Sequence, residues 1–210
     1  MKIIIPARRN SKGLPFKNRT LFKKTADIIP VSHKNIVYVV TDDEKITEMA
    51  NSYGFNTLDR PSSVSSDEAS TKELMIYIID KLKLRDEKIV MLYLTYPSRK
   101  WSDVEKALEE FDKNKCQSLL CKLPLKTSPF LILKEENDNR GSQLFYHNLY
   151  RRQDYPKCFE LSHYVCILNS SEINKLNNNL YNNLTYFLPI WGDVIDVDYK
   201  EDLEKYERQQ

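Results

Sequence analysis

The sequence predicts an α/β fold in which a mixed, mainly parallel sheet is covered by helices on both faces. Short runs rich in Ile and Val alternate with charged, amphipathic stretches through the first half of the chain. This alternation is typical of a three-layer α/β/α architecture. At 210 residues, 41% of them hydrophobic, the chain suits a single domain, residues 1–210, with a core of normal size.

The first expected elements are two strands and a helix. Residues 3–5 are three consecutive isoleucines, and Pro6 ends this run. Residues 36–40 form a second apolar run, which predicts a buried strand. Residues 43–53 have apolar side chains at helical spacing and an acidic first turn, and Gly54 gives the stop signal. We therefore expect a helix over 43–53.

The alternation continues to residue 121. Leu74, Ile78 and Leu82 form one stripe at helical spacing, and Ser70 with Glu73 matches a capping box at the start of that helix. The remaining expected elements are a short strand at 55–58, a helix at 72–84, a strand at 88–94, a helix at 103–111 and a strand at 117–121.

The pattern changes between residues 122 and 157, where helical periodicity is lost. β-prone residues at 130–133 and 143–145 flank a polar turn at 135–141. We expect residues 124–157 to form a hairpin-like arm that leaves the sheet. The domain then resumes with a strand at 164–168, a polar helix at 171–179, a strand at 194–197 and a closing helix at 201–208.

Composition limits the partners and the location. The formal net charge is +2, from 32 basic and 30 acidic residues, so we expect neither nucleic acid nor a membrane as partner. No apolar run approaches the roughly 20 residues of a membrane span, and residues 3–5 are too short for a signal peptide. The four cysteines lack zinc-ligand spacing. We expect reduced thiols and a cytoplasmic protein.

A basic loop follows the first strand. Arg8, Arg9, Lys12 and Lys17 lie close together in the sequence, just after that strand ends. Open α/β sheets build nucleotide sites in this way, because backbone N–H groups and basic side chains can cradle phosphates. The loop has neither of the glycine patterns of the common phosphate-binding folds. The alternative interpretation is a solvated basic turn.

Two carboxylates lie near the chain's end. Asp196 and Asp198 are two residues apart, within and directly after the expected strand at 194–197. Residues two apart in a strand face the same side, so this pair can share a hard cation. Mg²⁺ takes one or two carboxylates, with waters and substrate phosphates as its other ligands. The alternative is a solvated strand end.

Three other polar segments have both a structural and a functional interpretation. Asp42 is expected to cap the following helix with Asp43 near the helix dipole, or the two can be ligands. Arg60 and the hydroxyl-rich residues 65–71 suit helix capping, or a grip on a base and ribose. The adjacent arginines at 151–152 could bind an anionic substrate, or they are ordinary solvated surface residues.

Taken in order, these segments resemble the motifs of the CMP-acylneuraminate synthetase cytidylyltransferases, a family that includes enzymes activating other nonulosonic acids. Residues 5–18 resemble its opening signature, and residues 60–71 resemble its R-P-x-x-L-S/A-x-D-x-A-S-[ST] stretch. Looser matches follow the family's order at residues 41–43, 92–103, 128–130, 151–154 and 196–203. The resemblance covers nearly the whole chain.

The resemblance implies a Rossmann-like sheet of the nucleotide-diphospho-sugar transferase type. It also implies that a hydroxyl of a small acidic acceptor, an acidic sugar, attacks the α-phosphate of CTP. This reaction releases pyrophosphate and gives a CMP-sugar for surface glycan synthesis. Positioning and charge neutralisation, with Mg²⁺ as cofactor, carry such a transfer. The arm at 124–157 would dimerise and complete the partner's sugar pocket, which implies a homodimer.

The resemblance assigns roles to individual residues as well. The catalytic contacts with the triphosphate would come from Arg8, Lys12 and Lys17. The nucleotide would be bound by Ala7, Ser11, Asn18, Arg60, Ala69 and Thr71, the acceptor by Tyr93, Arg151, Arg152 and His163, and Mg²⁺ by Asp196 and Asp198.

The chain departs from the family pattern at four places. The segment after Asn18 is shorter, so the family's helix there is absent or remodelled into residues 21–33. Tyr93 replaces a Gln that contacts the sugar, Tyr96 replaces a Ser, and Ser162-His163 replaces Asn-Gly. Each stranded polar group of a sialic acid would cost about 1–3 kcal/mol. We therefore hypothesise another nonulosonic acid, or a small phosphonate or phosphorylated compound, as acceptor.

Two further hypotheses stay open at this point. One is a catalytically inactive relative that still binds a nucleotide. The other is a guanylyl- or uridylyltransferase, because such enzymes share the same phosphate chemistry. Arg60 and Thr71 do not decide the base, since neither side chain by itself recognises an exocyclic amine.

Overall fold

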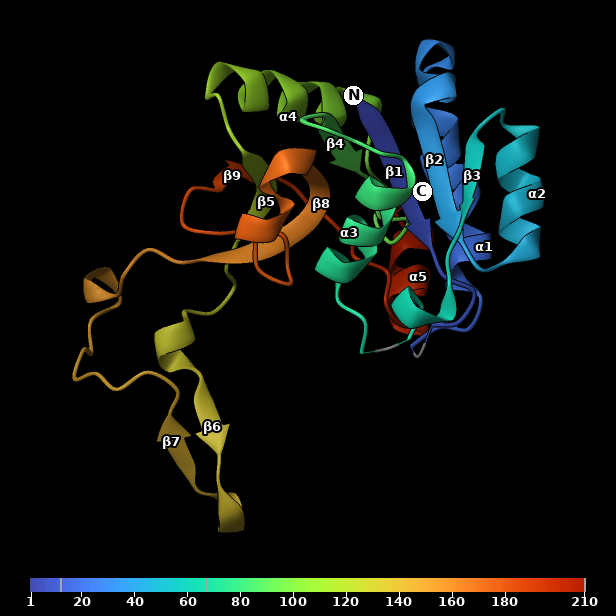
Figure 1. Ribbon diagram of the computed structural model, residues 1–210. Coiled ribbons are helices and arrows are strands. Elements are labelled where there is room, and N and C mark those ends of the chain that lie inside the picture. The colour runs from blue at the N-terminus through green and yellow to red at the C-terminus, as the bar shows by residue number, and fades with distance from the viewer. Residues whose placement is uncertain (12, 67, 210) are drawn as a thin grey trace.

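A seven-stranded sheet runs through the part of the chain that the computed structural model describes, residues 1–11, 13–66 and 68–209. Its order is β3-β2-β1-β4-β8-β5-β9 (Figure 1). β8 is antiparallel to β4 and β5, and the other pairs are parallel. The strands are β1 (Lys2–Ala7), β2 (Val37–Thr41), β3 (Asn56–Asp59), β4 (Lys88–Met91), β5 (Ser118–Pro124), β8 (Phe159–Asn169) and β9 (Tyr186–Pro189). The predicted mixed, mainly parallel sheet is confirmed.

Helices cover both faces of this sheet, as predicted. Ile3 and Ile5 pack with one set of helices and Ile4 with the other, because neighbouring residues of a strand point to opposite faces. One face holds α1 (Lys17–Ile28), α2 (Glu44–Ser52), α4 (Trp101–Lys113) and α5 (Lys200–Glu207). The other face holds α3 (Thr71–Lys81) and the 3₁₀ helix η6 (Ser170–Lys175).

The sheet has its topological switch point at β1. The chain passes from β1 to β2 and β3 on one side and returns to β4 on the other. In open α/β sheets, ligands bind beyond the carboxyl ends of the strands at this point. The carboxyl ends of β1 and β2 are joined at this point, because the Thr41 hydroxyl donates to the Ala7 carbonyl at 2.5 Å.

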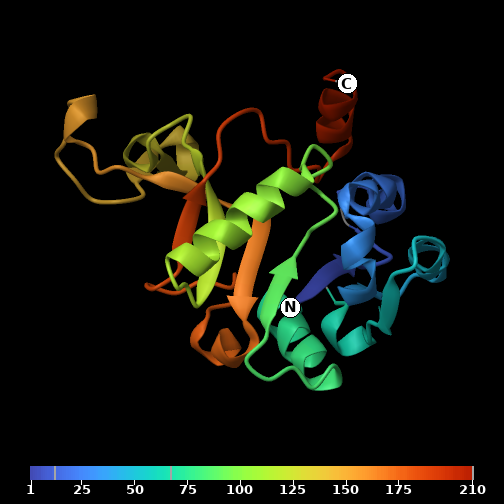
Figure 2. The same ribbon diagram turned by 90° about the horizontal axis from the view of Figure 1, so that it is seen from above.

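The arm leaves the sheet on the side of β5 and β9, away from β3 (Figures 1 and 2). It carries the antiparallel hairpin of β6 (Leu133–Glu135) and β7 (Gly141–Gln143). The arm has aromatic packing of its own, because the Phe130 and Tyr155 rings stack with their centroids 5.9 Å apart. The predicted protruding arm is confirmed, with a shorter hairpin than the β-prone residues suggested.

The local signals at the helix ends act as predicted in two cases. Ser70 and Glu73 form the capping box of α3, and Gly54 follows α2 with a φ of +75°. The prediction at Asp42 was wrong. Asp43 is the N-cap of α2, and its carboxylate accepts from the Lys45 backbone N–H at 3.0 Å.

The segment after Asn18 is remodelled but still helical. α1 begins at Lys17, four residues before the expected start at residue 21, and it is followed by the 3₁₀ helix η1 (Val31–Ile36). The short connection therefore leaves room for three turns of helix. The buried side chains of α1 include Leu21 and Phe22, which pack against the sheet.

Two predicted elements near the carboxyl end were wrong. Residues 194–197 form no strand in the described chain, and the Val197 N–H instead donates to the Thr95 carbonyl at 2.8 Å. The expected helix at 171–179 is the short 3₁₀ helix η6. β9 was not predicted. Across the described residues, no helix is both long enough and apolar enough to cross a membrane.

Candidate active site

A cavity of about 390 Å³ lies at the switch point of the sheet. Eleven of the residues that the sequence singled out line it, from both ends and the middle of the chain. They are Arg8, Ser11, Lys17, Asn18, Arg60, Ala69, Thr71, Tyr93, His163, Asp196 and Asp198. The loop after β1, the start of α3, the loop after β4 and the segment before α5 together form its walls.

The basic loop folds back on β1 because α1 begins at its end. Phe16, the residue before α1, has a left-handed backbone with φ 55°, and the Arg19 guanidinium lies 4.2 Å from its ring centroid. The Asn18 amide donates to the Arg8 carbonyl at 2.8 Å. Lys17 and Asn18 are thereby held beside the first residues of the loop, facing the cavity.

Lys17 joins the two ends of the chain. Its Nζ lies 2.5 Å from Asp198 Oδ1 and 3.2 Å from the Val197 carbonyl oxygen. The Lys17 side chain is 11% exposed and that of Asp198 is 59% exposed, so the lysine forms the inner side of this ion pair. An ammonium has three N–H donors, of which these two contacts use two.

Gly13 shows how closely the basic loop packs on this segment. A Cβ atom at position 13 would lie 2.3 Å from the Asp198 carbonyl oxygen and 3.1 Å from the Tyr199 ring. Such contacts are far inside van der Waals distance, so a larger residue would push the loop away. Asp202 fixes the backbone of the segment that Gly13 contacts. Its carboxylate accepts from the Asp198 and Tyr199 N–H groups at 3.1 and 2.9 Å.

The two aspartates create negative charge in the cavity. Burial raises the pKa of Asp196, hydrogen bonds from the Thr95 and Tyr96 hydroxyls oppose this shift, and the charge of Asp198 adds to it. A cation at this place would therefore be stabilised by both carboxylates. Among the described residues, no group of three or more His, Cys, Asp or Glu side chains forms a metal site. A pair nevertheless fits Mg²⁺, which takes few protein ligands.

The opposite wall comes from the segment between β3 and α3. Arg60 is anchored by its Nε and Nη2 atoms, which donate to the Val64 carbonyl at 3.0 and 2.7 Å. Burial lowers the pKa of Arg60, and the nearby Asp42 charge opposes that shift. Ala69 and Thr71 flank the N-cap Ser70, so the first turn of α3 faces the cavity.

Aromatic residues form the third wall. The Tyr93 and Thr71 hydroxyl oxygens are 3.0 Å apart, and the Tyr93 ring meets the His163 ring edge-on with centroids 5.5 Å apart. Burial raises the pKa of Tyr93 and lowers that of His163. His163 Nε2 lies 3.2 Å from the Asn179 carbonyl oxygen. This wall presents neutral rings and hydroxyl groups.

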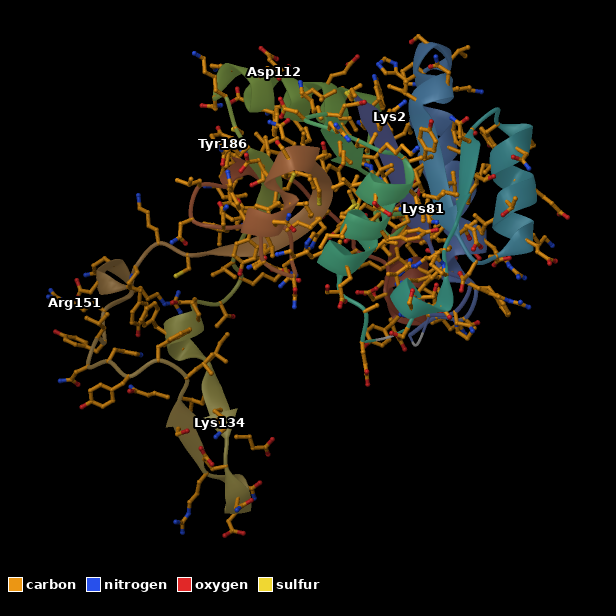
Figure 3. All side chains as sticks on the ribbon, in the orientation of Figure 1. Lys2, Lys81, Asp112, Lys134, Arg151 and Tyr186 are labelled. Atoms are coloured by element: carbon orange, nitrogen blue, oxygen red, sulfur yellow. The ribbon has the colours of Figure 1, made fainter. Side chains whose placement is uncertain are left out.

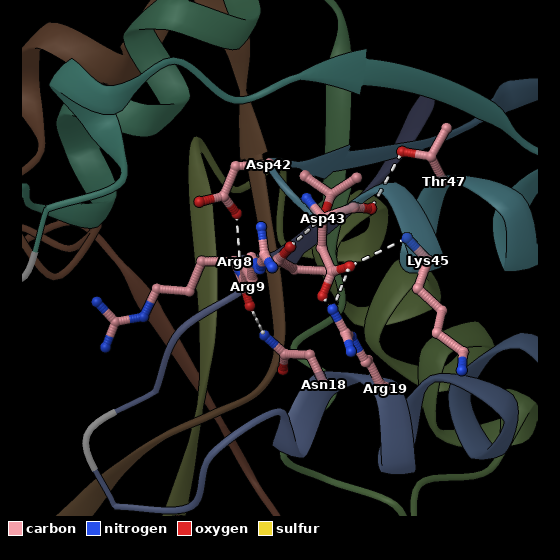
Figure 4. A network of polar contacts seen from close by, with 10 residues as sticks. Arg8, Arg9, Asn18, Arg19, Asp42, Asp43, Lys45 and Thr47 are labelled. Atoms are coloured by element: carbon pink, nitrogen blue, oxygen red, sulfur yellow. Dashed lines mark hydrogen bonds and ion pairs between the residues drawn. The ribbon is translucent and has the colours of Figure 1, made fainter.

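A second polar network supports the basic loop from behind (Figure 4). Arg19 donates to both carboxylate oxygens of Asp43, at 2.7 and 3.0 Å. The Arg9 backbone N–H donates to Asp42 at 2.7 Å. The Thr41-Asp42-Asp43 segment therefore fixes the loop and the start of α1.

Three predicted site residues lie elsewhere, and a fourth is outside the described residues. Ala7 is fully buried at the end of β1 and does not line the cavity. Arg151 and Arg152 are on the arm, far from the cavity of the same chain, and Arg151 pairs with Asp154 at 3.0 Å (Figure 3). Lys12 lies outside the described residues, as does Asp67 of the hydroxyl-rich segment.

Sequence reasoning missed Thr95, whose hydroxyl meets Asp196 and whose carbonyl accepts the Val197 N–H. The signal was present in the sequence. Thr95 comes directly after the apolar run at 88–94, and the ends of parallel strands are where ligands bind. Pro6 and Leu94 line the cavity for the same reason.

A family model described as Cytidylyltransferase matches residues 2–130. The chain belongs to the cytidylyltransferase family. This family consists of CTP-dependent nucleotidyltransferases, and the matched region includes the basic loop, Arg60, the start of α3 and Tyr93.

Several curated proteins are similar to this cytidylyltransferase. The post-translational flagellin modification protein B of Campylobacter coli is 24% identical, over 95% of this chain and 90% of that protein. The N-acylneuraminate cytidylyltransferase of Streptococcus agalactiae serotype V is 24% identical over 95% of this chain. This chain spans about half the length of that streptococcal relative.

Solved structures with the same fold include two nucleotidyltransferases. A CMP:2-keto-3-deoxy-manno-octonic acid synthetase complexed with CTP has a TM-score of 0.67 at 16% identity, over 99% of this chain and 97% of that one. A 4-diphosphocytidyl-2C-methyl-D-erythritol synthase from Anaerococcus prevotii has a TM-score of 0.60 at 12% identity, over 100% and 98%. These likenesses confirm the nucleotide-diphospho-sugar transferase fold.

Proposed function

We propose that the chain transfers CMP from CTP to an acidic sugar of the nonulosonic class and releases pyrophosphate. One observation carries this proposal. The cavity brings the cationic loop after β1 together with the carboxylates that precede α5, although they come from opposite ends of the sequence. Cations directly beside paired carboxylates suit a magnesium triphosphate.

The nucleotide would occupy the half of the cavity between the basic loop and α3. Lys17 and Arg8 would neutralise the triphosphate, and Lys12 has the same role by its place in the loop. Asn18, Arg60 and Thr71 would surround the nucleoside, which also contacts the first turn of α3. The family membership supports cytosine as the base.

The divalent cation would be held by Asp196 and Asp198. When bound, Mg²⁺ supplies charge neutralisation on the phosphate oxygens. Thr95 and Tyr96 orient Asp196 through their hydroxyl groups, and Lys17 orients Asp198. These three residues therefore preorganise the carboxylate pair before a cation arrives.

The acceptor would lie against Tyr93 and His163, next to the phosphate half. Its hydroxyl oxygen forms the new bond to the α-phosphorus while the bond to pyrophosphate breaks. The relatives' names support an acidic sugar, because they include N-acylneuraminate and pseudaminic acid cytidylyltransferases. The aromatic wall supports an acceptor that differs from N-acetylneuraminate, since a phenol replaces the amide seen in the resembling family.

The arm would complete the site in a homodimer. It exposes several large apolar side chains, among them Leu133, Phe145 and Tyr146. Phe145 packs on the Phe130 ring with centroids 5.7 Å apart, yet 50% of Phe145 stays exposed. A second copy would cover these exposed side chains. Arg151 and Arg152 would then reach the acceptor pocket of the partner.

Pyrophosphate release tests the proposal. CTP and Mg²⁺ are incubated with a panel of acids: N-acetylneuraminate, pseudaminic acid, 2-keto-3-deoxy-manno-octonic acid, and a small phosphonate. We expect release with CTP, much less with GTP or UTP, and none after chelation of the metal or in Asp198→Ala. Strong turnover of N-acetylneuraminate would contradict the altered acceptor wall. Binding of CTP without release from any acid would instead indicate an inactive relative.

A further inference from the structure

Tyr93 and His163 form the wall of the cavity that is proposed to bind the acceptor, and we name it the acceptor wall. Arg99 is buried behind this wall and does not itself line the cavity. Its side chain is among the largest that are fully buried, with 2% of the residue exposed. It lies in the loop between β4 and α4, two residues before the helix begins. Burial lowers the pKa of Arg99 to about 10, so the guanidinium is still charged at neutral pH.

The guanidinium contacts two backbone carbonyls and one hydroxyl. Nη1 donates to the Tyr164 carbonyl at 2.6 Å, and Nη2 donates to the Tyr93 carbonyl at 2.8 Å. A longer contact of 3.4 Å joins Nη2 to the Thr25 hydroxyl of α1. None of these partners is a carboxylate, and within the described chain Nε has no hydrogen-bond partner.

Burying a guanidinium without a carboxylate partner costs free energy of folding. We therefore expect its hydrogen bonds to have a structural role. They join the two segments that carry the acceptor wall. Tyr93 belongs to the loop after β4, and Tyr164 directly follows His163 in β8. The Arg99 guanidinium also lies 5.9 Å from the Tyr164 ring centroid. Because the neighbouring side chains of Tyr164 and His163 point to opposite faces of β8, Arg99 lies behind the strand while His163 faces the cavity.

Tyr164 is also held at its other end. Its hydroxyl donates to Asp103 Oδ2 at 2.6 Å, and the same oxygen accepts from the Lys100 N–H that starts α4. The hydroxyl bond fixes the ring of Tyr164, whereas the Arg99 bond fixes its backbone. The two contacts can therefore be removed separately.

We propose that Arg99 is a positioning residue for acceptor specificity: by joining the Tyr93 and Tyr164 carbonyls, it sets the distance between the Tyr93 and His163 rings. The proposal rests on the proposed function only where it assigns this wall to the acceptor. The guanidinium takes no part in the chemistry. Its planar fork suits the task, because it presents two N–H groups in fixed directions toward two acceptors.

The test compares Arg99→Met, Arg99→Lys and the matched control Tyr164→Phe. The first readout needs no substrate. It is the NMR chemical shifts of the His163 ring C–H groups, which depend on the Tyr93 ring because the two centroids are 5.5 Å apart. The chain has three histidines, so His163→Gln assigns the signals. We expect a shift in Arg99→Met, a smaller one in Arg99→Lys, and wild-type positions in Tyr164→Phe.

The second readout is kinetic, with the acid that the pyrophosphate panel turns over best. In Arg99→Met, the KM for the acid rises about tenfold, as expected for one lost polar contact, and the KM for CTP stays within about twofold. If Arg99→Met does not fold, Arg99→Lys provides both readouts. Unchanged His163 signals in the Arg99 variants, or an equal shift in Tyr164→Phe, would overturn the proposal.

The two readouts separate this proposal from the proposed function. A shift of the His163 signals with both KM values unchanged refutes the specificity role of Arg99 while the backbone contact stands. Absence of pyrophosphate release in the wild-type protein refutes the proposed function, and the substrate-free NMR comparison still decides whether Arg99 sets the ring distance.

Discussion

Lys17 Nζ and Asp198 Oδ1 are 2.5 Å apart although 181 positions separate the two residues in the sequence. This ion pair closes the cavity between the first and last segments of the domain. It also joins a residue proposed to bind phosphate to a residue proposed to bind the metal. When a magnesium triphosphate binds, both partners can contact it from their present places.

Gly13 is predicted to control nucleotide binding through its contact with Asp198. In Gly13→Ala, the new Cβ meets the Asp198 carbonyl, so the basic loop moves outward. We expect the affinity for CTP to fall roughly 10–100-fold, the range for misplacement of binding groups by about 1 Å. Titration calorimetry with CTP and Mg²⁺ measures this effect.

Gly54→Ala is the matched control for that change. Gly54 has a φ of +75° and open space around its Cα, so alanine there strains the backbone and touches no neighbour. We expect a loss of about 1 kcal/mol in the free energy of unfolding with unchanged CTP affinity. Equal CTP affinities in Gly13→Ala and the wild type would refute the role of the close contact.

The pair of Arg19 and Asp43 predicts an acid-dependent part of the stability. Burial opposes ionisation of Asp43, but the Arg19 hydrogen bond and the Lys45 N–H outweigh it and lower the pKa of this carboxyl. A lowered pKa stabilises the fold above the unfolded-state value of about 3.9, and this contribution is lost as the pH falls through the folded-state value.

Asp43→Asn isolates this contribution, because Asn still caps a helix but cannot pair with Arg19. We expect the urea midpoint of the variant to lie below that of the wild type at pH 7. The difference should shrink as the pH falls below 4, because the wild-type carboxyl becomes protonated. A difference that stays constant down to pH 2.5 would contradict the assignment.

If the arm of one chain completes the pocket of its partner, mixing two different inactive variants should restore activity. Asp198→Asn removes a proposed Mg²⁺ ligand from the pocket but keeps the arm. The Arg151→Ala/Arg152→Ala variant removes the arm's cations but keeps the pocket. Each homodimer should be inactive. In an equal mixture, random exchange gives heterodimers with one complete site, so about a quarter of the wild-type activity should return. A mixture as inactive as its components would show that the arm does not reach a partner's pocket.

The sequence was most informative where local signals and tertiary packing agree. The strand at residues 3–5, the capping box of Ser70 and the stop at Gly54 depend on neighbouring residues, and all were predicted. Eleven of the residues that line the cavity were predicted as well, because the resemblance fixed their order along the chain and the strand ends bring them together.

The failures lie where tertiary contacts override the local pattern. The apolar alternation at residues 194–197 is that of a strand, yet the segment crosses the strand ends and bonds to the Thr95 carbonyl. β9 is a short edge strand that ends at Pro189, which masks its strand character. Asp43 rather than Asp42 caps α2 because Arg19, distant in sequence, fixes its position. Arg99 has no local signal for its role, since both of its carbonyl partners are backbone atoms.

CTP binding to variants of Lys17 and Asp198 shows whether the two ends of the chain form one triphosphate site. Titration calorimetry with CTP and Mg²⁺ is carried out on the wild type, Lys17→Met, Asp198→Asn and the double variant. We predict that each single variant loses most of the affinity and that the double variant loses little more, because the residues act on one ligand. CTP binding by Lys17→Met as tight as that of the wild type would contradict the claim.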